Sequence, residues 1–252
     1  MAASAVVSGS AMAWTANGTG NSVELGGTLT PVAKVTPWEV KTGNAVTDLD
    51  AQIQIGQQVV SVDVKKPIPV LGIRTASTDA FEGKVGINPQ IDYQGVVDLE
   101  GAENGSHDGL MPLNLKVYDD SGEIGTLTTK ILAGGAVSRL NSDDMYSVYP
   151  NDGVSTYAFK GGISTVGGSV AYFSDLRSRL NALDPTITAN FNEQGVRDVG
   201  EWKAPDFNTD EKYSGFYGSG IEQGQTIKIS LKVPAAEAIT WKASLPVTVT
   251  YM

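Results

Sequence analysis

Side chains suited to nucleophilic or acid–base catalysis are scarce in this sequence. It contains one histidine, His107, no cysteine and no Gly-x-Ser-x-Gly motif. His107 lies in the stretch ENGSHDG, whose composition is typical of a surface loop. The usual pairs of nucleophile and base therefore lack a member. The 28 acidic residues always allow two carboxylates to be paired for glycoside hydrolysis, so such a pair has no diagnostic value. We expect a protein without catalytic residues and without a cofactor.

One segment has the ligand spacing of a calcium-binding loop. Asn190, Asn192, Gln194, Gly195 and Glu201 occupy positions 1, 3, 5, 6 and 12 of the EF-hand pattern. The first position carries no charge, the fifth is Gln, and no clear helix follows. Because Ca²⁺ requires several anionic oxygens, we interpret the segment as a turn without a metal.

Aromatic residues are the remaining source of binding chemistry. An exposed aromatic face beside polar side chains can dock a sugar ring, but most aromatic residues pack a core. Both interpretations stay open for two groups, one before an expected helix and one in a Gly/Ser-rich segment: Tyr146, Tyr149, Tyr157, Phe159, Tyr172 and Phe173, and then Tyr213, Phe216 and Tyr217.

Charge and hydropathy exclude some classes of partner and location. The formal net charge is −10, and no window combines clustered Lys and Arg with aromatic residues, so nucleic acid is not expected as a partner. No apolar run approaches the roughly 18 residues that a membrane-spanning helix needs.

The first 13 residues are expected to be the remnant of a secretory signal peptide. Small and apolar residues lead to Ala11-Met12-Ala13, a small-x-small cleavage site, and Trp14 would begin the mature chain. The basic region that opens such signals is absent, and an ordinary flexible N-terminus is the alternative. Because an exported chain without cysteine has no disulfides, burial and sheet hydrogen bonds must supply its stability.

Alternation of apolar and polar residues predicts a mostly β protein. The clearest runs are Ile53–Val64, Leu113–Tyr118, Gly125–Leu132, Gly224–Val233 and Leu245–Met252. Asp119-Asp120-Ser121-Gly122 is a turn signal, so Leu113 to Leu132 should be a hairpin. Short strands at regular spacing favour a β-sandwich in one domain.

One helix is predicted before Pro185. Ser174 is a suitable N-cap, and Leu176, Leu180 and Leu183 share one face. These leucines should pack on the sandwich, which would turn Arg177 and Arg179 toward solvent.

Several stretches together resemble the FaeG-like major subunits and adhesins of enterobacterial chaperone-usher fimbriae. The similar stretches occur in the same order and include NSVELGGTLT (21–30), PWEVKTG (37–43), KPIPVLGIRT (66–75), NPQIDYQG (88–95), GQTIKISLKV (224–233) and WKASLPVTVTYM (241–252). The resemblance is weakest over about 138–217. Subunits of this family end in aromatic residues, whereas here Tyr251 is followed by Met252.

The resemblance implies an incomplete immunoglobulin-like β-sandwich, with one or two short inserted helices, that is completed by donor-strand complementation. Residues 14–30 would be the N-terminal donor extension, and 31–252 the Ig-like pilin domain, with an insertion around 140–217. The side chains expected to fill the groove of a neighbouring copy are Val23, Leu25, Gly27 and Leu29. Alternation supports this, because a period of two places these residues on one face of a strand. From the residues alone, pairing of this strand within its own chain is equally open.

The resemblance also implies partners and a location. Subunits are exported through the periplasm to a cell-surface fimbrium, where they polymerise with other copies. Before that, a periplasmic chaperone contacts the C-terminal strand, here Leu245, Val247, Val249 and Tyr251, until an outer-membrane usher exchanges it. Host glycans are expected to bind the middle region, where the chemistry of the side chains suggests Tyr157, Phe159, Lys160, Arg177 and Arg179. The alternatives are a free secreted β-sandwich lectin or glycan-active enzyme, and a minor or shaft-only subunit.

Overall fold

The computed structural model describes residues 25–30, 35–149 and 156–252. The chain divides into two units, residues 1–35 and residues 36–252. In the first unit, residues 25–30 form neither helix nor strand and are exposed. All named elements lie in the second unit, which is called the body below.

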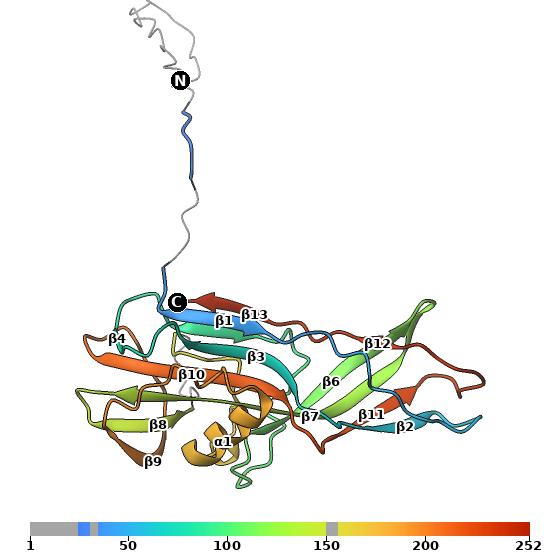
Figure 1. Ribbon diagram of the computed structural model, residues 1–252. Helices are drawn as coiled ribbons and strands as arrows, with labels where there is room; N and C mark the ends of the chain where they lie inside the picture. Colours follow the sequence, from blue (N-terminus) through green and yellow to red (C-terminus); the bar gives the residue numbers. More distant parts are fainter. Residues whose placement is uncertain (1–24, 31–34, 150–155) are drawn as a thin grey trace, which may run out of the picture. The chain divides into compact units, whose positions relative to one another are not determined.

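The body is built on one large, mostly antiparallel sheet, and the alternating sequence predicts such strands (Figure 1). Its main path runs through six strands in the order β1 (Trp38–Thr42), β3 (Ile68–Thr75), β10 (Lys212–Ile221), β7 (Gly122–Arg139), β11 (Thr226–Leu231) and β2 (Val59–Asp63). The strand β7 has 18 residues and spans both halves of the body: its residues 132–139 pair with β10, and its residues 125–128 pair with β11.

Further strands complete this sheet and add a second layer. β6 (Leu110–Asp119) and β8 (Asp144–Val148) pair with β7, β9 (Arg197–Lys203) runs parallel to β8, and β4 (Phe81–Glu82) pairs with β10. β12 (Lys242–Ala243) pairs with β6, and β13 (Thr248–Tyr251) forms a separate two-stranded sheet with β5 (Pro89–Asp92). The fold is therefore all-β and sandwich-like, which confirms the predicted class.

The predicted hairpin between β6 and β7 is present, with Asp119 as the reason for its turn. The Asp119 carboxylate accepts hydrogen bonds from the backbone N–H groups of Ser121 (2.7 Å) and Gly122 (3.1 Å), and Gly122 has a φ of 134°. The strand predicted over Ile53–Val64 is wrong in its first half. Gly56 adopts a φ of 87° in a turn there, so the strand β2 begins only at Val59.

The helix α1 (Phe173–Leu183) begins two residues earlier than predicted. Tyr172 occupies the N-cap position and makes no side-chain capping hydrogen bond, so the prediction of Ser174 as N-cap is wrong. The helix ends before Asp184 and Pro185, as expected. Leu176, Leu180 and Leu183 are buried, which confirms the predicted apolar face.

Two glycines on adjacent strands let α1 pack closely on the sheet, and a third glycine lies beside them. Gly218 on β10 lies opposite Gly72 on β3 and Gly134 on β7 in the strand register. A Cβ atom at Gly218 would lie 2.8 Å from Leu180, and one at Gly134 would lie 2.7 Å from Leu176. Side chains at Gly134 and Gly218 would therefore hold the helix away from the sheet, whereas one at Gly72 would meet Ile187, beyond the end of α1.

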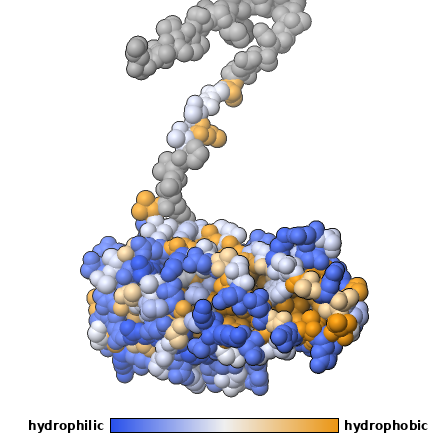
Figure 2. Space-filling model, turned by 45° about the vertical axis from the view of Figure 1, so that its right-hand side comes forward, coloured by the Kyte–Doolittle hydropathy of each residue, from blue (hydrophilic) through white to orange (hydrophobic). Residues whose placement is uncertain are grey.

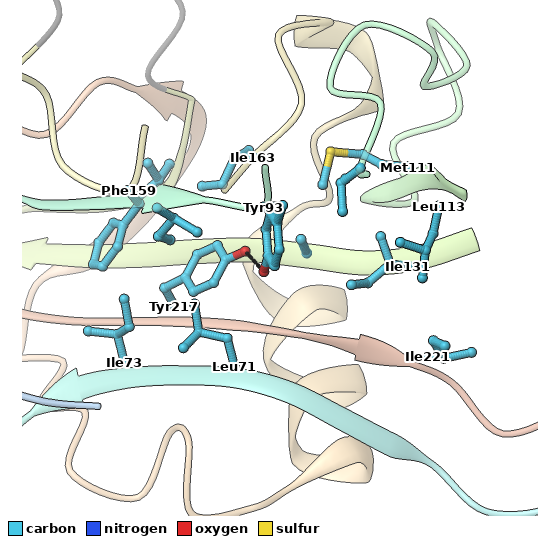
Figure 3. Packing of buried hydrophobic residues seen from close by; sticks show 14 of the residues in the cluster. Leu71, Ile73, Tyr93, Met111, Leu113, Ile131, Phe159, Ile163, Tyr217 and Ile221 are labelled. Carbon is cyan, nitrogen blue, oxygen red and sulfur yellow. Dashed lines mark hydrogen bonds between the residues drawn. The ribbon is translucent and has the colours of Figure 1, made fainter. Parts of the chain in front are cut away.

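The opposite face of the same strands carries the main core (Figure 3). Tyr217 of β10 points into this core, and its hydroxyl bonds the Tyr93 hydroxyl at 2.8 Å and donates to the Gly162 carbonyl at 2.7 Å. The Tyr93 hydroxyl also bonds Ser219 at 2.6 Å. Burial raises the pKa of Tyr93 to about 12 and that of Tyr217 well above its usual value, so both hydroxyls stay neutral.

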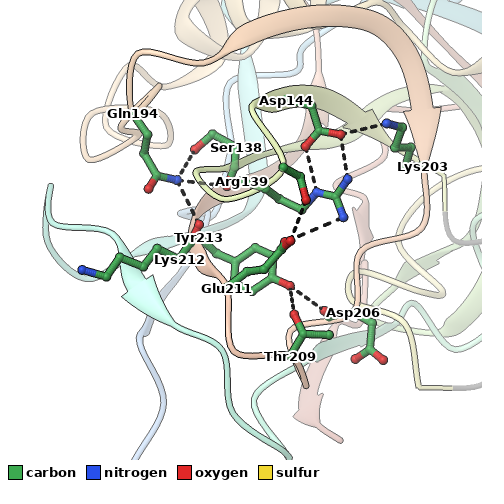
Figure 4. Close-up of polar contacts among 11 residues, drawn as sticks. Ser138, Arg139, Asp144, Gln194, Lys203, Asp206, Thr209, Glu211, Lys212 and Tyr213 are labelled. Carbon is green, nitrogen blue, oxygen red and sulfur yellow. Dashed lines mark hydrogen bonds and ion pairs between the residues drawn. The ribbon is translucent and has the colours of Figure 1, made fainter.

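A charged cluster fixes the end of β7 to β8 and β9 (Figure 4). Arg139 donates two hydrogen bonds to the Asp144 carboxylate, at 2.8 and 2.7 Å, and Lys203 of β9 contacts the same carboxylate at 2.8 Å. Burial alone would raise the pKa of Asp144, but these two cations hold it below its usual value. The ionised carboxylate therefore joins three strands at this end of the sheet.

We predict that Gly218→Val lowers the free energy of unfolding by about 1–3 kcal/mol, because the added carbons overlap Leu180 and force α1 off the sheet. Equilibrium urea unfolding measures this change. Gly26→Val is the matched control, since a Cβ there meets nothing within 4 Å. Equal unfolding midpoints for the two variants would contradict the close helix packing.

Candidate functional site

The body contains an apolar groove of about 1230 Å³. Its floor consists of inward-facing side chains from six strands, and these are Val60, Val62, Ile68, Val70, Leu113, Leu115, Leu127, Ile221, Ile227, Ile229 and Leu231. In β6 and β11 buried and exposed residues alternate, which is why one face of each strand supplies only apolar groups. Figure 2 shows hydrophobic residues gathered at the right-hand end of the body, the end where β2, β11 and β12 lie in Figure 1.

Two extended segments, paired with a strand only at Lys242 and Ala243 in the described part of the chain, flank the groove. One comprises residues 44–53 and the other residues 236–247, and both contribute lining residues. Within the described part of the chain, no backbone hydrogen bond is made by residues 44–53, 236–240 or 245–247. Lys242 and Ala243 pair with β6 as the strand β12.

Apolar side chains on these flanks are incompletely covered. Val46 is 38% exposed and Ile239 is 36% exposed, while Leu49, Ile53 and Trp241 are half-buried. A contiguous apolar cleft with free backbone groups on both sides has the geometry of a sheet that lacks one strand. Such an edge binds an extended peptide, because main-chain hydrogen bonds provide affinity and the cleft accepts alternate side chains.

The groove flanks were not predicted as a site. The sequence predicts a strand that includes residues 53–58, and it predicts no structure or role for residues 44–52 and 236–240. The apolar residues Val46, Leu49 and Ile53 follow neither a helical nor a strict strand period, so the sequence offers no clear signal for them.

The predicted C-terminal contact residues are divided between the groove and the second layer. Leu245 and Val247 line the groove, whereas Val249 and Tyr251 belong to β13 and pair with Ile91 and Pro89. All four side chains are half-buried and pack against the main core.

Of the predicted donor residues, Leu25 and Leu29 are 94% and 97% exposed. Gly27 is also exposed, and Val23 lies outside the described residues.

The predicted receptor-binding residues do not come together. Residues 157–160 lie on the side of the sheet that carries the main core, where Phe159 is fully buried and stacks on Tyr217 with ring centroids 5.7 Å apart. Arg177 and Arg179 lie on α1, which covers the opposite face. Successive residues of a strand point to opposite faces. Tyr217 of β10 therefore packs in the main core, whereas the neighbouring Phe216 packs in the hydrophobic cluster that contains the leucines of α1.

The two arginines are also more buried than expected. Arg177 is paired with Glu193, and Arg179 with Glu222 at 2.6 Å and with the Asp108 carbonyl. About a quarter to a third of each side chain is exposed, so the helix does not turn them freely to solvent.

Tyr157 has a different setting, since it lines a small polar pocket of about 200 Å³. The other lining residues are Arg139, Tyr146, Ala204, Asp206, Thr209, Glu211 and Tyr213. The pocket therefore combines aromatic rings with charged and hydroxyl groups.

The side chains of His107 and of the calcium-like segment make packing and hydrogen-bond contacts within the fold. The His107 ring stacks on Trp202, with centroids 5.0 Å apart and planes within 1°. In the segment 190–201, the amide of Asn190 donates to the Thr75 carbonyl, and the amide of Gln194 donates to Ser138. These amides hold loops in place, which agrees with the interpretation as a turn.

Comparison with known proteins relates the whole chain to fimbrial proteins. The family model described as fimbrial, major and minor subunit, matches residues 1–252. The chain is 26% identical over 281 positions to the K88 fimbrial protein AB of Escherichia coli, covering 99% of this chain and 96% of the relative. It is also 26% identical over 275 positions to the F41 fimbrial protein of Escherichia coli, covering 100% and 96%.

We predict that amide hydrogens of residues 44–53 and 236–240 exchange rapidly in the monomer, because they have no hydrogen-bond acceptor among the residues that the structure describes. Those of β6 and β7, paired along the central sheet, should be strongly protected. Native-state hydrogen exchange with mass spectrometry checks both. Protection of the two flanks equal to that of β7 would show that the groove is already closed.

Proposed function

The chain belongs to the family of major and minor fimbrial subunits, and from that premise we propose that it polymerises by donor-strand exchange, accepting the N-terminal segment of a neighbouring copy in its groove. Membership of this family makes the protein a structural component of an exported surface fimbria and a subunit that assembles with others. Among the described residues no helix is long and apolar enough to cross a membrane.

The observation that carries the proposal is the groove with its two unpaired flanks. An inserted strand would supply acceptors and donors to residues 44–53 and 236–240 and would cover the apolar floor. The segment NSVELGGTLT suits this role, because Val23, Leu25, Gly27 and Leu29 lie on one face and carry no polar side chain. Ten residues of strand extend about 33 Å, which is comparable to the length of a twelve-residue flank.

The direction of the inserted strand follows from the two flanks. Residues 236–247 belong to the edge of a sheet, since β12 pairs with β6 and β13 continues the same segment. Residues 44–53 pair with no strand in the described part of the chain. Because antiparallel pairing is the more stable arrangement, the donor should run antiparallel to 236–247. The donor end that carries Val23 would then point toward Val247, and the end that carries Leu29 toward Ala236.

The same groove explains the need for the proposed assembly partners. An open apolar edge is an aggregation hazard before the donor arrives. A periplasmic chaperone that covers Leu245 and Val247, and an outer-membrane usher that exchanges it for the next subunit, would remove this hazard. The matched family is one of structural subunits, and no enzyme activity is proposed.

We predict that Leu25→Asp prevents polymerisation, because insertion would bury an unpaired carboxylate at a cost of several kcal/mol. Fimbriae joined by strand insertion should run as a ladder on SDS gels before heating and as a single band after boiling. Thr28→Asp is the matched control, since residue 28 faces away from the groove and should keep the ladder. A normal ladder from Leu25→Asp would refute the donor assignment.

Attachment to host glycans is a second proposed function, and the small pocket at Tyr157 favours it. A pocket of about 200 Å³ with three tyrosines, Arg139 and Glu211 offers aromatic faces and hydrogen-bonding groups to one sugar ring. Phe159 is excluded from this site because it is buried.

We predict that Tyr157→Ala weakens binding of assembled fimbriae on a glycan array by about tenfold or more, as expected for loss of one stacking contact. Arg177→Ala, which changes the opposite face of the sheet, should bind as the unchanged protein does. Equal binding by both variants would remove the pocket from consideration, and absence of any glycan binding would favour a shaft-only role.

A further inference from the structure

Three aliphatic side chains are exposed together at one end of the groove. Ile55 is 86% exposed, Val233 is 71% exposed and Val59 is 48% exposed. We call these three residues the apolar tip. They lie beside the start of the flank 236–247, because Ala235, the residue that precedes this flank, pairs with the turn that contains Ile55.

The apolar tip is held by backbone hydrogen bonds. Gly56 donates to the Ala235 carbonyl at 2.9 Å, and Ala235 donates to the Gln57 carbonyl at 2.9 Å. Leu231 donates to the Gln58 carbonyl at 2.7 Å, and Val59 faces Ser230 in the register of β2 and β11. The exposed side chains are thus presented by a paired framework, as a contact surface requires.

We propose that the apolar tip is the contact surface for the body of the donating subunit, a second copy of this chain. This inference rests on the proposed donor-strand function. In the direction argued above, Thr30 of the donor leaves the groove near Ala236, which is the end where the apolar tip lies. Only residues 31–37 separate Thr30 from Trp38, where β1 of the donating body begins. Seven residues reach at most about 25 Å, so that body must stand next to the tip.

The surroundings of the tip suit an apolar contact. Lys232, the charged neighbour of Val233, is paired with Glu123 at 2.8 Å, and Glu123 also pairs with Lys116 at 3.0 Å. A second surface can therefore approach without leaving one of these charges unpaired. In the donating copy, the body begins at Thr36, which hydrogen-bonds Tyr251, and the adjacent Met252 is 51% exposed. Met252 is thus an apolar group at the place where contact is expected.

Single cysteines can test this contact, because the chain contains no cysteine of its own. Ile55→Cys and Val233→Cys would be compared with Leu140→Cys, whose position follows the far end of β7 and is 43% exposed. Each full-length variant would react with a maleimide in two states. In one, a synthetic peptide of residues 21–30 fills the groove of the monomer, and in the other, the variant is assembled into fimbriae. The peptide supplies the strand but no donating body.

We expect labelling at positions 55 and 233 to be at least about tenfold slower in fimbriae than in the peptide-filled monomer, because contact removes the thiol from solvent. The rate at position 140 should be the same in both states. Equal rates in both states at 55 and 233, with peptide binding and fimbriae intact, would overturn the tip contact and leave strand exchange standing. Failure of the peptide to bind and of fimbriae to form would overturn both proposals.

Discussion

The organisation of this protein depends on the backbone of residues 44–53 and 236–240, which has no backbone partner in the described part of the chain. Peptide groups at the edge of a sheet need partners, and the apolar floor between these flanks needs a cover. Water can satisfy the backbone groups of a free monomer, but it does not satisfy the apolar floor. A strand satisfies both requirements together, which is why this feature suits a protein that assembles with copies of itself.

The part of the body away from the groove holds the strands of the groove floor in place. The long strand β7 passes from a closed half, where β10 pairs with it, to the open half, where β11 pairs with it. In the closed half, both faces of the sheet are covered. Gly134 and Gly218 allow α1 to approach one face, and Tyr93 and Tyr217 join the layers on the other. The closed half thus provides a rigid anchor for the groove.

The candidate receptor-binding residues are grouped by their chemistry and their closeness in sequence, and the fold separates them. Aromatic residues at 157 and 159 and arginines at 177 and 179 are near one another in sequence and of suitable chemistry. In the fold, a central sheet separates the two pairs, and Phe159 fills the core. Tyr157 alone of these residues lines a polar pocket, because Arg139 of β7, Tyr146 of β8 and Tyr213 of β10 converge beside it.

The sequence alone determined the features that depend on local periodicity and turn chemistry. These include the all-β class, the β6–β7 hairpin with its Asp119 turn, and the buried face of α1, because each depends on residues within a few positions of one another. Only the tertiary structure decided where the groove lies. Its floor and flanks come from segments nearly 200 residues apart, and their lack of backbone partners depends on which strands the rest of the chain places beside them.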